Sequence, residues 1–495
     1  MHQKSSSGSE YELKFRDSSI PKELSNSSPQ IGKQSNASDD SINLKDAGNL
    51  PNDHYKSKLS PIRYKFREFL LPIIRYETNI LYNLQTKIRN PIFDFYFAWT
   101  ANLASHTFYV LMLPPPLWFG ASQLSRDLIY VLGLGIYFTG FLKDYFCLPR
   151  PRSPPLHRIT MSSYTTQEYG FPSSHSANAT AVTLVLLSRV YKYGDSLTTS
   201  TYYSLIIGLT IYYFSLIFGR LYCGMHGFLD IFIGSSVGGA LFLFRHYYGI
   251  VWDNFIFNQG LILGSLLILV LFIGLIHFHS EPVDDCPCFD DSVAFIGVLI
   301  GLDLSHLVAF HTKFYLQFND INDLYLIPFE NKGIVMLTIR FLVGVTLVVI
   351  WKSLSKPIIF TILPPIYKFI GIYLPRRNFI STAHTDSSIG RIRATSISND
   401  VSQIGDLNNF LKGVTDHNRI DNIGPSSEID YYEILDYNNK NKNGSSYDLD
   451  KLNFKSGVFK YRYDVEIVGR LIVYAGVSIT TIWTFTFVSM YLIEI

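Results

Sequence analysis

The sequence predicts an all-α polytopic membrane protein, because its composition is apolar and its apolar residues are grouped. Hydrophobic residues make up 47% of the 495-residue chain and charged residues only 17%. The apolar residues gather into runs of about 20, the length at which a helix crosses a hydrocarbon core about 30 Å thick. A soluble protein is disfavoured, because its helices would carry a polar face instead of being apolar all round. We therefore expect a helical bundle with about 9 to 11 spans.

The hydropathy pattern defines the candidate spans and leaves one region ambiguous. The spans cover residues 127–146, 176–191, 202–219, 228–246, 256–278, 291–310, 333–351, 357–374 and 471–491. Residues 92–123 are interrupted by Pro114, Pro115 and Pro116. They are expected to form either one kinked span or a hairpin of two short ones.

Polar blocks divide the chain into parts. The predicted parts are a disordered polar N-terminal tail (1–55), a basic juxtamembrane segment (56–91), a core that contains the chemical motifs (92–250), additional spans (251–375), a disordered polar cytosolic loop (376–461) and a C-terminal span (462–495). Disorder is expected in the two polar blocks, because they bury too little apolar surface to offset the entropy lost on ordering.

Charge and cysteine usage limit the possible partners. The net charge is only +2 and the basic residues lie at span ends, so no nucleic-acid partner is expected. The lipid bilayer is the expected partner, and the sequence indicates no particular protein partner. The four cysteines are too few for a disulfide framework and match no common zinc pattern.

The order of the spans predicts which polar segments meet. Two spans separate the segment from Lys143 to His175 from the segment that ends at His226, so both lie on the same side of the membrane. Arg189 and Lys192 lie in the connector between those spans, which the positive-inside rule places in the cytosol. The same rule places 376–461 in the cytosol. The polar cluster then faces the lumen, as does the loop with Cys286 and Cys288, where a disulfide is permitted.

The first chemical motif is the segment from Lys143 to Pro151. Arg150 is seven positions after Lys143, close to two helical turns, so both cations can project to one side of a span end. Two cations on one side suit a phosphate. The alternative is that both side chains reach from a span end toward the membrane surface, as Lys and Arg commonly do.

The second motif is Pro172-Ser173-Ser174-His175, directly before an apolar run. Ser173 and Ser174 are at the start of a helix, where unpaired backbone N–H groups favour an anion. His175 can exchange a proton near neutral pH. The alternative is a helix cap that adjoins a histidine by chance.

The third motif joins Arg220, His226 and Asp230. His226 and Asp230 are four residues apart and share one helix face, so the carboxylate can orient the imidazole and make its other nitrogen a better nucleophile. Arg220 adds a planar set of donors suited to phosphate oxygens. A structural His–Asp pair is the alternative, but ionisable residues at membrane depth favour a functional site.

Together the three motifs resemble the signature of the phosphatidic-acid-phosphatase type 2 superfamily. That signature is Lys, six residues, Arg-Pro; then Pro-Ser-Gly-His; then Ser-Arg, five residues, His, three residues, Asp. This sequence keeps every internal spacing between residues 140 and 235. It departs at Ser174, where Gly is usual, and at Gly219, where Ser is usual. The sequence around these motifs is most similar to the sphingosine-1-phosphate phosphatase branch, in particular its fungal members.

The resemblance implies the role of each residue. His226 would be the nucleophile that forms a phosphohistidine, Asp230 would orient it, and His175 would be the general acid and base. The phosphate-binding residues would be Lys143, Arg150, Arg220, Ser173 and Ser174. No cofactor and no metal are expected, because three cations already stabilise the charge on the phosphate.

The resemblance also implies the substrate and the location. The expected substrate is a membrane lipid phosphate, specifically a sphingoid long-chain-base 1-phosphate, which the protein would hydrolyse to the free base and phosphate. Phosphatidic acid and a polyprenyl phosphate are alternative substrates, and a non-catalytic lipid-phosphate transporter or scaffold is an alternative function. The expected location is the endoplasmic reticulum membrane, with the active site facing the lumen.

Overall fold

The computed structural model describes residues 47–50, 52–161, 168–284, 286–312, 334–370, 463 and 465–491. Every regular element in these ranges is a helix, which confirms the all-α prediction. Residues 1–46 and 376–461, predicted to be disordered, lie outside the described residues. The predicted tail is nevertheless too long, because part of residues 47–55 is held by specific contacts. The Gly48 amide donates to Asp284 at 2.7 Å, and the Tyr55 hydroxyl donates to the same carboxylate at 2.6 Å.

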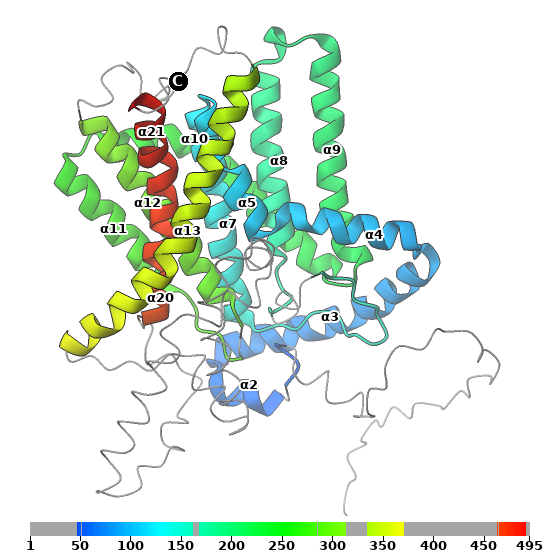
Figure 1. The fold of residues 1–495 in the computed structure, drawn as a ribbon. Helices are drawn as coiled ribbons and strands as arrows, with labels where there is room; N and C mark the ends of the chain where they lie inside the picture. The colour runs from blue at the N-terminus through cyan, green and yellow to red at the C-terminus, as the bar shows by residue number, and fades with distance from the viewer. Residues whose placement is uncertain are drawn as a thin grey trace, which may run out of the picture. The chain divides into compact units, whose positions relative to one another are not determined.

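Long helices form the bundle shown in Figure 1. They are α7 (Ser122–Phe146), α8 (Ser174–Lys192), α9 (Thr199–Tyr222), α10 (Phe228–Phe257), α11 (Leu261–Phe278), α12 (Cys288–His311), α13 (Ile334–Ile370) and α20 (Val465–Ile479), which continues through a π-helical turn (Thr480–Thr484) into α21 (Phe485–Tyr491). Helix α10 approaches α8 closely at Gly238, where an added Cβ would lie 2.1 Å from the Ala177 carbonyl oxygen.

Six of the described helices are long and apolar enough to cross a membrane. They are α9, α10, α11, α12, α13 and the continuous α20–α21 helix. Helices α7 and α8, with 25 and 19 residues, are not among the six, although both pack inside the same bundle. The multi-pass architecture is thus as predicted, but the described residues contain fewer spans than the predicted 9 to 11.

One reason for the lower count is that the predicted spans 333–351 and 357–374 are a single helix. Helix α13 runs unbroken through Pro357, Pro364 and Pro365. A proline removes one backbone hydrogen bond, but neighbouring helices can compensate inside a membrane protein, so the chain need not turn there. The prediction of two spans was therefore wrong.

The second reason is the region 92–123, which is neither a kinked span nor a hairpin of spans. It forms α4 (Pro91–Thr100), a 3-10 turn (Ala101–Ala104), α5 (His106–Met112) and α6 (Pro114–Trp118). None of these is long enough to cross a bilayer. Figure 1 shows α4 crossing the lower end of α9, against which it packs.

The basic segment 56–91 is part of the folded unit. It contributes the end of α2 (Asn52–Lys58) and the long α3 (Pro61–Ile88). Gln85 on α3 donates from Nε2 to the carbonyl oxygens of His157 at 2.7 Å and Tyr222 at 2.9 Å. Arg67 is 2% exposed and donates to Cys147 and Gly48 carbonyls. Helix α3 therefore packs against the ends of α7 and α9.

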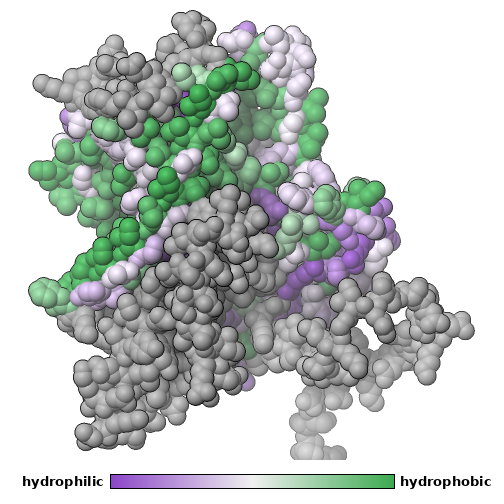
Figure 2. Space-filling model, viewed as in Figure 1, coloured by the Kyte–Doolittle hydropathy of each residue, from purple (hydrophilic) through white to green (hydrophobic). Residues whose placement is uncertain are grey.

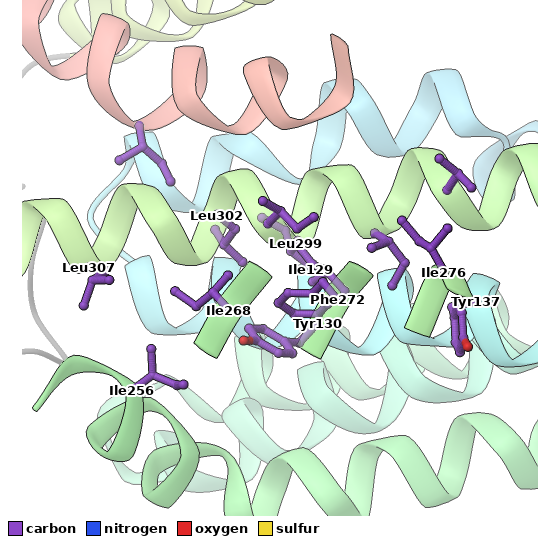
Figure 3. Packing of buried hydrophobic residues seen from close by; sticks show 14 of the residues in the cluster. Ile129, Tyr130, Tyr137, Ile256, Ile268, Phe272, Ile276, Leu299, Leu302 and Leu307 are labelled. Carbon is purple, nitrogen blue, oxygen red and sulfur yellow. The ribbon is translucent and has the colours of Figure 1, made fainter. Parts of the chain in front are cut away.

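Two kinds of apolar surface stabilise the fold. Inside, aliphatic and aromatic side chains of α7, α11 and α12 interlock, among them Ile129, Phe272 and Leu299 (Figure 3). Outside, large side chains such as Leu342 and Ile358 on α13 are exposed, and Figure 2 shows this helix as a hydrophobic face. An exposed apolar helix face is suited to contact with lipid.

Contacts place both ends of the undescribed segment between α13 and α20 at one end of the bundle. The Tyr367 hydroxyl donates to the Tyr463 carbonyl at 2.8 Å, and the Tyr463 hydroxyl lies 3.1 Å from Nδ1 of His277. Just after His277, Nδ1 of His279 lies 3.8 Å from the Asp144 carboxylate, next to Lys143 on α7. The ends of α13 and α20 that flank residues 371–462 therefore lie at the same end of the bundle as Lys143.

Candidate active site

The three sequence motifs meet at the end of the bundle where α7 and α9 end and α8 and α10 begin. Lys143 lies in the last turn of α7, and its ammonium is 3.4 Å from the Ser174 hydroxyl at the start of α8. Arg150 follows α7, and its Nη1 lies 3.0 Å from Nε2 of His226. His226 occupies the short turn between α9 and α10. Residues far apart in the sequence thus form one buried polar cluster.

The hydrogen bonds of His226 define which ring nitrogen carries the proton and which carries the lone pair. Nδ1 lies 2.9 Å from the carbonyl oxygen of Gly170. A carbonyl can only accept, so Nδ1 carries the proton and Nε2 carries the lone pair. Nε2 accepts from the guanidinium of Arg150, and therefore points at the place where a phosphate would be bound.

The surroundings of His226 keep the imidazole neutral. Burial lowers the pKa of His226 well below its usual value, and the positive charges of Arg150, Lys143 and Arg220 lower it further. His175 contributes in the same direction. A neutral imidazole retains its nucleophilic lone pair at physiological pH.

Asp230 lies near His226 but does not make its shortest contact. One carboxylate oxygen is 3.6 Å from Nδ1 of His226, compared with 2.9 Å for the Gly170 oxygen. The same oxygen accepts from the backbone N–H of Gly227 at 2.8 Å, at the start of α10. Asp230 is fully buried and therefore places a carboxylate beside the imidazole while capping the helix.

The start of α8 has the features of an anion site. The Ser173 hydroxyl caps the helix by accepting from the Ser176 backbone N–H at 3.3 Å and from its hydroxyl at 3.0 Å. The proton of the Ser173 hydroxyl is thereby left as a donor. His175 is half-buried in the first turn of α8 and close enough to His226 to affect its pKa.

Arg220 supplies the third cation from the last turn of α9. It is 5% exposed, and its Nε has no hydrogen-bond partner among the described residues. Buried donors are normally satisfied, so an unsatisfied guanidinium N–H beside a phosphate site indicates a ligand group.

Two further residues of this cluster were not predicted from the sequence. Gly170 orients His226 through its carbonyl, and Glu168 places its carboxylate between Lys143 and Arg150. The Glu168 carboxylate contacts the Lys143 ammonium and lies 3.6 Å from Nη2 of Arg150. The available signal was their place directly before Pro172-Ser173, but nothing in the spacing of the motifs indicates a carbonyl or a carboxylate there.

The loop with Cys286 and Cys288 forms the disulfide that its predicted location permitted. These two cysteines and Asp144 are the one group of potential metal ligands with closely spaced atoms among the described residues. Both thiols are consumed by the disulfide, so neither offers a thiolate to a metal.

Comparison with known proteins agrees with the geometry. The PAP2 superfamily matches residues 125–254, which contain all three motifs. The dihydrosphingosine 1-phosphate phosphatase YSR3 of Saccharomyces cerevisiae is 42% identical over 327 residues, covering 66% of this chain and 78% of the relative. The dihydrosphingosine 1-phosphate phosphatase C823.11 of Schizosaccharomyces pombe is 34% identical over 418 residues, covering 84% of this chain and 88% of the relative.

A more distant relative is human sphingosine-1-phosphate phosphatase 2, which is 26% identical over 296 residues, covering 57% of this chain and 69% of the relative. No solved structure matches the chain. The matched region, the identity to the two yeast proteins and the convergence of Lys143, Arg150, His175 and His226 on one site lead to the same conclusion. This chain belongs to the PAP2 superfamily, in the branch that contains the fungal dihydrosphingosine 1-phosphate phosphatases.

Proposed function

We propose that this protein hydrolyses sphingoid long-chain-base 1-phosphates to the free base and phosphate, through a phosphohistidine on His226. The names of its fungal relatives support the substrate class. The observation that carries the mechanism is the orientation of His226, whose Nδ1 is held by Gly170 and whose Nε2 faces the guanidinium of Arg150. A buried imidazole held in this way is a nucleophile aimed at a phosphate site.

In the first step, the phosphate binds Lys143, Arg150 and Arg220, and it displaces Nη1 of Arg150 from Nε2 of His226. Nε2 of His226 attacks phosphorus, the new P–N bond forms, and the P–O bond to the lipid breaks. His175 donates a proton to the departing alkoxide, so the free base leaves as an alcohol. The three cations stabilise the charge that spreads over the phosphate oxygens in the transition state.

In the second step, His175, now unprotonated, accepts a proton from water. The resulting hydroxide attacks the phosphohistidine, the P–N bond breaks, and phosphate is released. Throughout both steps the Gly170 carbonyl holds the Nδ1–H of His226, and the nearby Asp230 carboxylate stabilises positive charge on the ring. No step in this sequence requires a metal ion or an organic cofactor.

We further propose that the site faces the lumen of the endoplasmic reticulum. The last turn of α8 carries Arg189 and Lys192 and leads into the short connector to α9, at the opposite end of both helices from the site. Basic residues in a short connector favour the cytosolic side. A site at the ends of spans can bind the phosphate headgroup while the hydrocarbon chain stays in the bilayer.

The test is phosphate release from dihydrosphingosine 1-phosphate by the purified full-length protein. His226→Ala is expected to reduce kcat by at least about a thousandfold, because the nucleophile is removed. His246→Ala is the matched control, since His246 is exposed on α10 and is expected to leave activity unchanged. His175→Ala should also lower kcat strongly, because His175 acts as the acid in the first step and as the base in the second. Full activity of the His226→Ala protein would rule out this mechanism.

A further inference from the structure

The carboxylate of Glu168 lies where a bound phosphate would need its cations. It pairs with the Lys143 ammonium and lies 3.6 Å from Nη2 of Arg150, while the backbone carbonyl of Glu168 accepts from Nε of the same arginine at 3.1 Å. The side chains of Lys143 and Glu168 are 3% and 12% exposed. The site therefore contains a largely buried ion pair between the proposed phosphate-binding cation Lys143 and a carboxylate.

Phosphate binding must disturb this pair. When a phosphate takes the Lys143 ammonium, the Glu168 carboxylate loses this contact and lies beside another anion. A largely buried carboxylate that loses a cationic contact and gains an anionic neighbour is destabilised. A substrate that brought only a phosphate would therefore bind at a considerable cost in free energy.

A sphingoid base 1-phosphate brings a second charge. Its amino group is on the second carbon, directly next to the carbon that bears the phosphate oxygen, and it is protonated near neutral pH. We propose that Glu168 binds this ammonium group, so that the carboxylate exchanges the Lys143 ammonium for the ammonium of the substrate. This inference rests on the proposed function and assigns the residue that would select a sphingoid base over other lipid phosphates.

The exchange keeps the charges in the site paired. Before binding, Glu168 pairs with Lys143; afterwards the phosphate pairs with Lys143 and Arg150, and Glu168 pairs with the substrate. Phosphatidic acid has no amine, and an N-acylated sphingoid phosphate has a neutral amide at that position. With either of these lipids, the Glu168 carboxylate would lose the Lys143 ammonium and gain no ammonium in exchange. The site should therefore bind them less well than a sphingoid base 1-phosphate.

The test compares two substrates that differ only at the nitrogen, dihydrosphingosine 1-phosphate and its N-acetyl derivative. Glu168→Gln keeps the size of the side chain and removes its charge. In purified full-length protein, we expect this variant to lower kcat/KM for dihydrosphingosine 1-phosphate about tenfold to a hundredfold. The value for the N-acetyl derivative should change less than about threefold or rise, since no ammonium contact is lost there.

Two controls separate recognition from damage to the site. Inhibition by orthovanadate should persist in Glu168→Gln, because the phosphate-binding cations remain. Glu68→Gln changes an exposed glutamate on α3 and should leave both substrates unaffected. Glu168→Asp, which retains the charge, should restore part of the preference for dihydrosphingosine 1-phosphate over its N-acetyl derivative.

Three results would overturn the inference. An equal loss of kcat/KM for both substrates in Glu168→Gln would mean a structural role for Glu168. An equal gain of kcat/KM would mean that the carboxylate only competes with the phosphate for its cations. Wild-type protein that hydrolyses the N-acetyl derivative as fast as dihydrosphingosine 1-phosphate would also refute ammonium recognition, while leaving the phosphatase activity established. Wild-type protein inactive on every lipid phosphate would instead refute the proposed function itself.

Discussion

Gly170 links the backbone of the site to its chemistry. Its carbonyl accepts the Nδ1–H of His226, and its own N–H donates to the Leu148 carbonyl at 2.8 Å. An added Cβ would lie 2.6 Å from the Pro149 carbonyl oxygen and 2.8 Å from Cα of Arg150. Only glycine therefore allows the loop before α8 to pack against the loop that carries Arg150.

Gly170→Ala should consequently impair catalysis. The backbone must shift to relieve the contact, which moves the carbonyl that orients His226 and the guanidinium that faces it. A misplacement of about 1 Å can cost about a hundredfold in rate, so we expect kcat to fall by that order. The measurement is kcat for dihydrosphingosine 1-phosphate, with the thermal unfolding midpoint recorded alongside.

Gly274→Ala is the matched control. It adds the same methyl group in α11, where a Cβ would meet nothing within 4 Å. That variant should keep both activity and stability. An unchanged kcat in Gly170→Ala would show that the Gly170 carbonyl does not determine the position of the imidazole.

At the scale of elements, α3 supports the start of α10 from outside the membrane bundle. Glu77 on α3 accepts the backbone N–H of Leu229 at 3.0 Å, in the first turn of α10. Burial raises the pKa of Glu77, and its backbone hydrogen bonds with α10 act in the opposite direction. A helix that the sequence indicated only as a basic juxtamembrane segment thus caps the helix that carries Asp230.

Glu77→Ala should destabilise the protein by about 1–2 kcal/mol, the usual cost of losing an N-terminal cap. Glu68→Ala on the same helix is the control, because Glu68 is exposed and should contribute little. Thermal unfolding of the purified protein in detergent provides the comparison. Equal midpoints for the two variants would argue against a capping role for Glu77.

At the scale of the whole molecule, the continuity of α13 decides which segments share a side of the membrane. The helix ends that flank residues 371–462 lie at the same end of the bundle as Lys143. A lumenal active site therefore requires that the segment between α13 and α20 also begins and ends in the lumen. This consequence can be tested without assaying activity.

Asn443-Gly444-Ser445, within that segment, is an acceptor sequence for N-glycosylation. If the site is lumenal, the wild-type protein expressed in a eukaryotic cell should carry a glycan that Asn443→Gln removes, measured as a mobility shift after glycosidase treatment. An acceptor sequence inserted in the connector at Gly194–Ser196 should remain unmodified. The reverse pattern would place the active site in the cytosol.

The chemistry of the site was predictable because it depends on local spacing. Lys143 and Arg150 at a span end, and His226 with Asp230 one turn apart, signal a phosphate site wherever the spans bring them together. Glu168 and Gly170 were not predictable in the same way. Glu168 is 25 residues from Lys143, with no helical period between them, so only the folded loop brings carboxylate and ammonium together.

The sequence by itself determined that the chain is an all-α membrane protein, and its motifs named the ionisable residues that the structure brings together, because hydropathy and motif spacing are properties of the chain. The tertiary structure decided whether two apolar runs are one helix or two, and which group holds the nucleophile. Hydropathy does not distinguish one continuous helix that contains prolines, such as α13, from two helices joined by a turn. Likewise, a carbonyl such as that of Gly170 has no side-chain signature, and its role arises only where two loops pack.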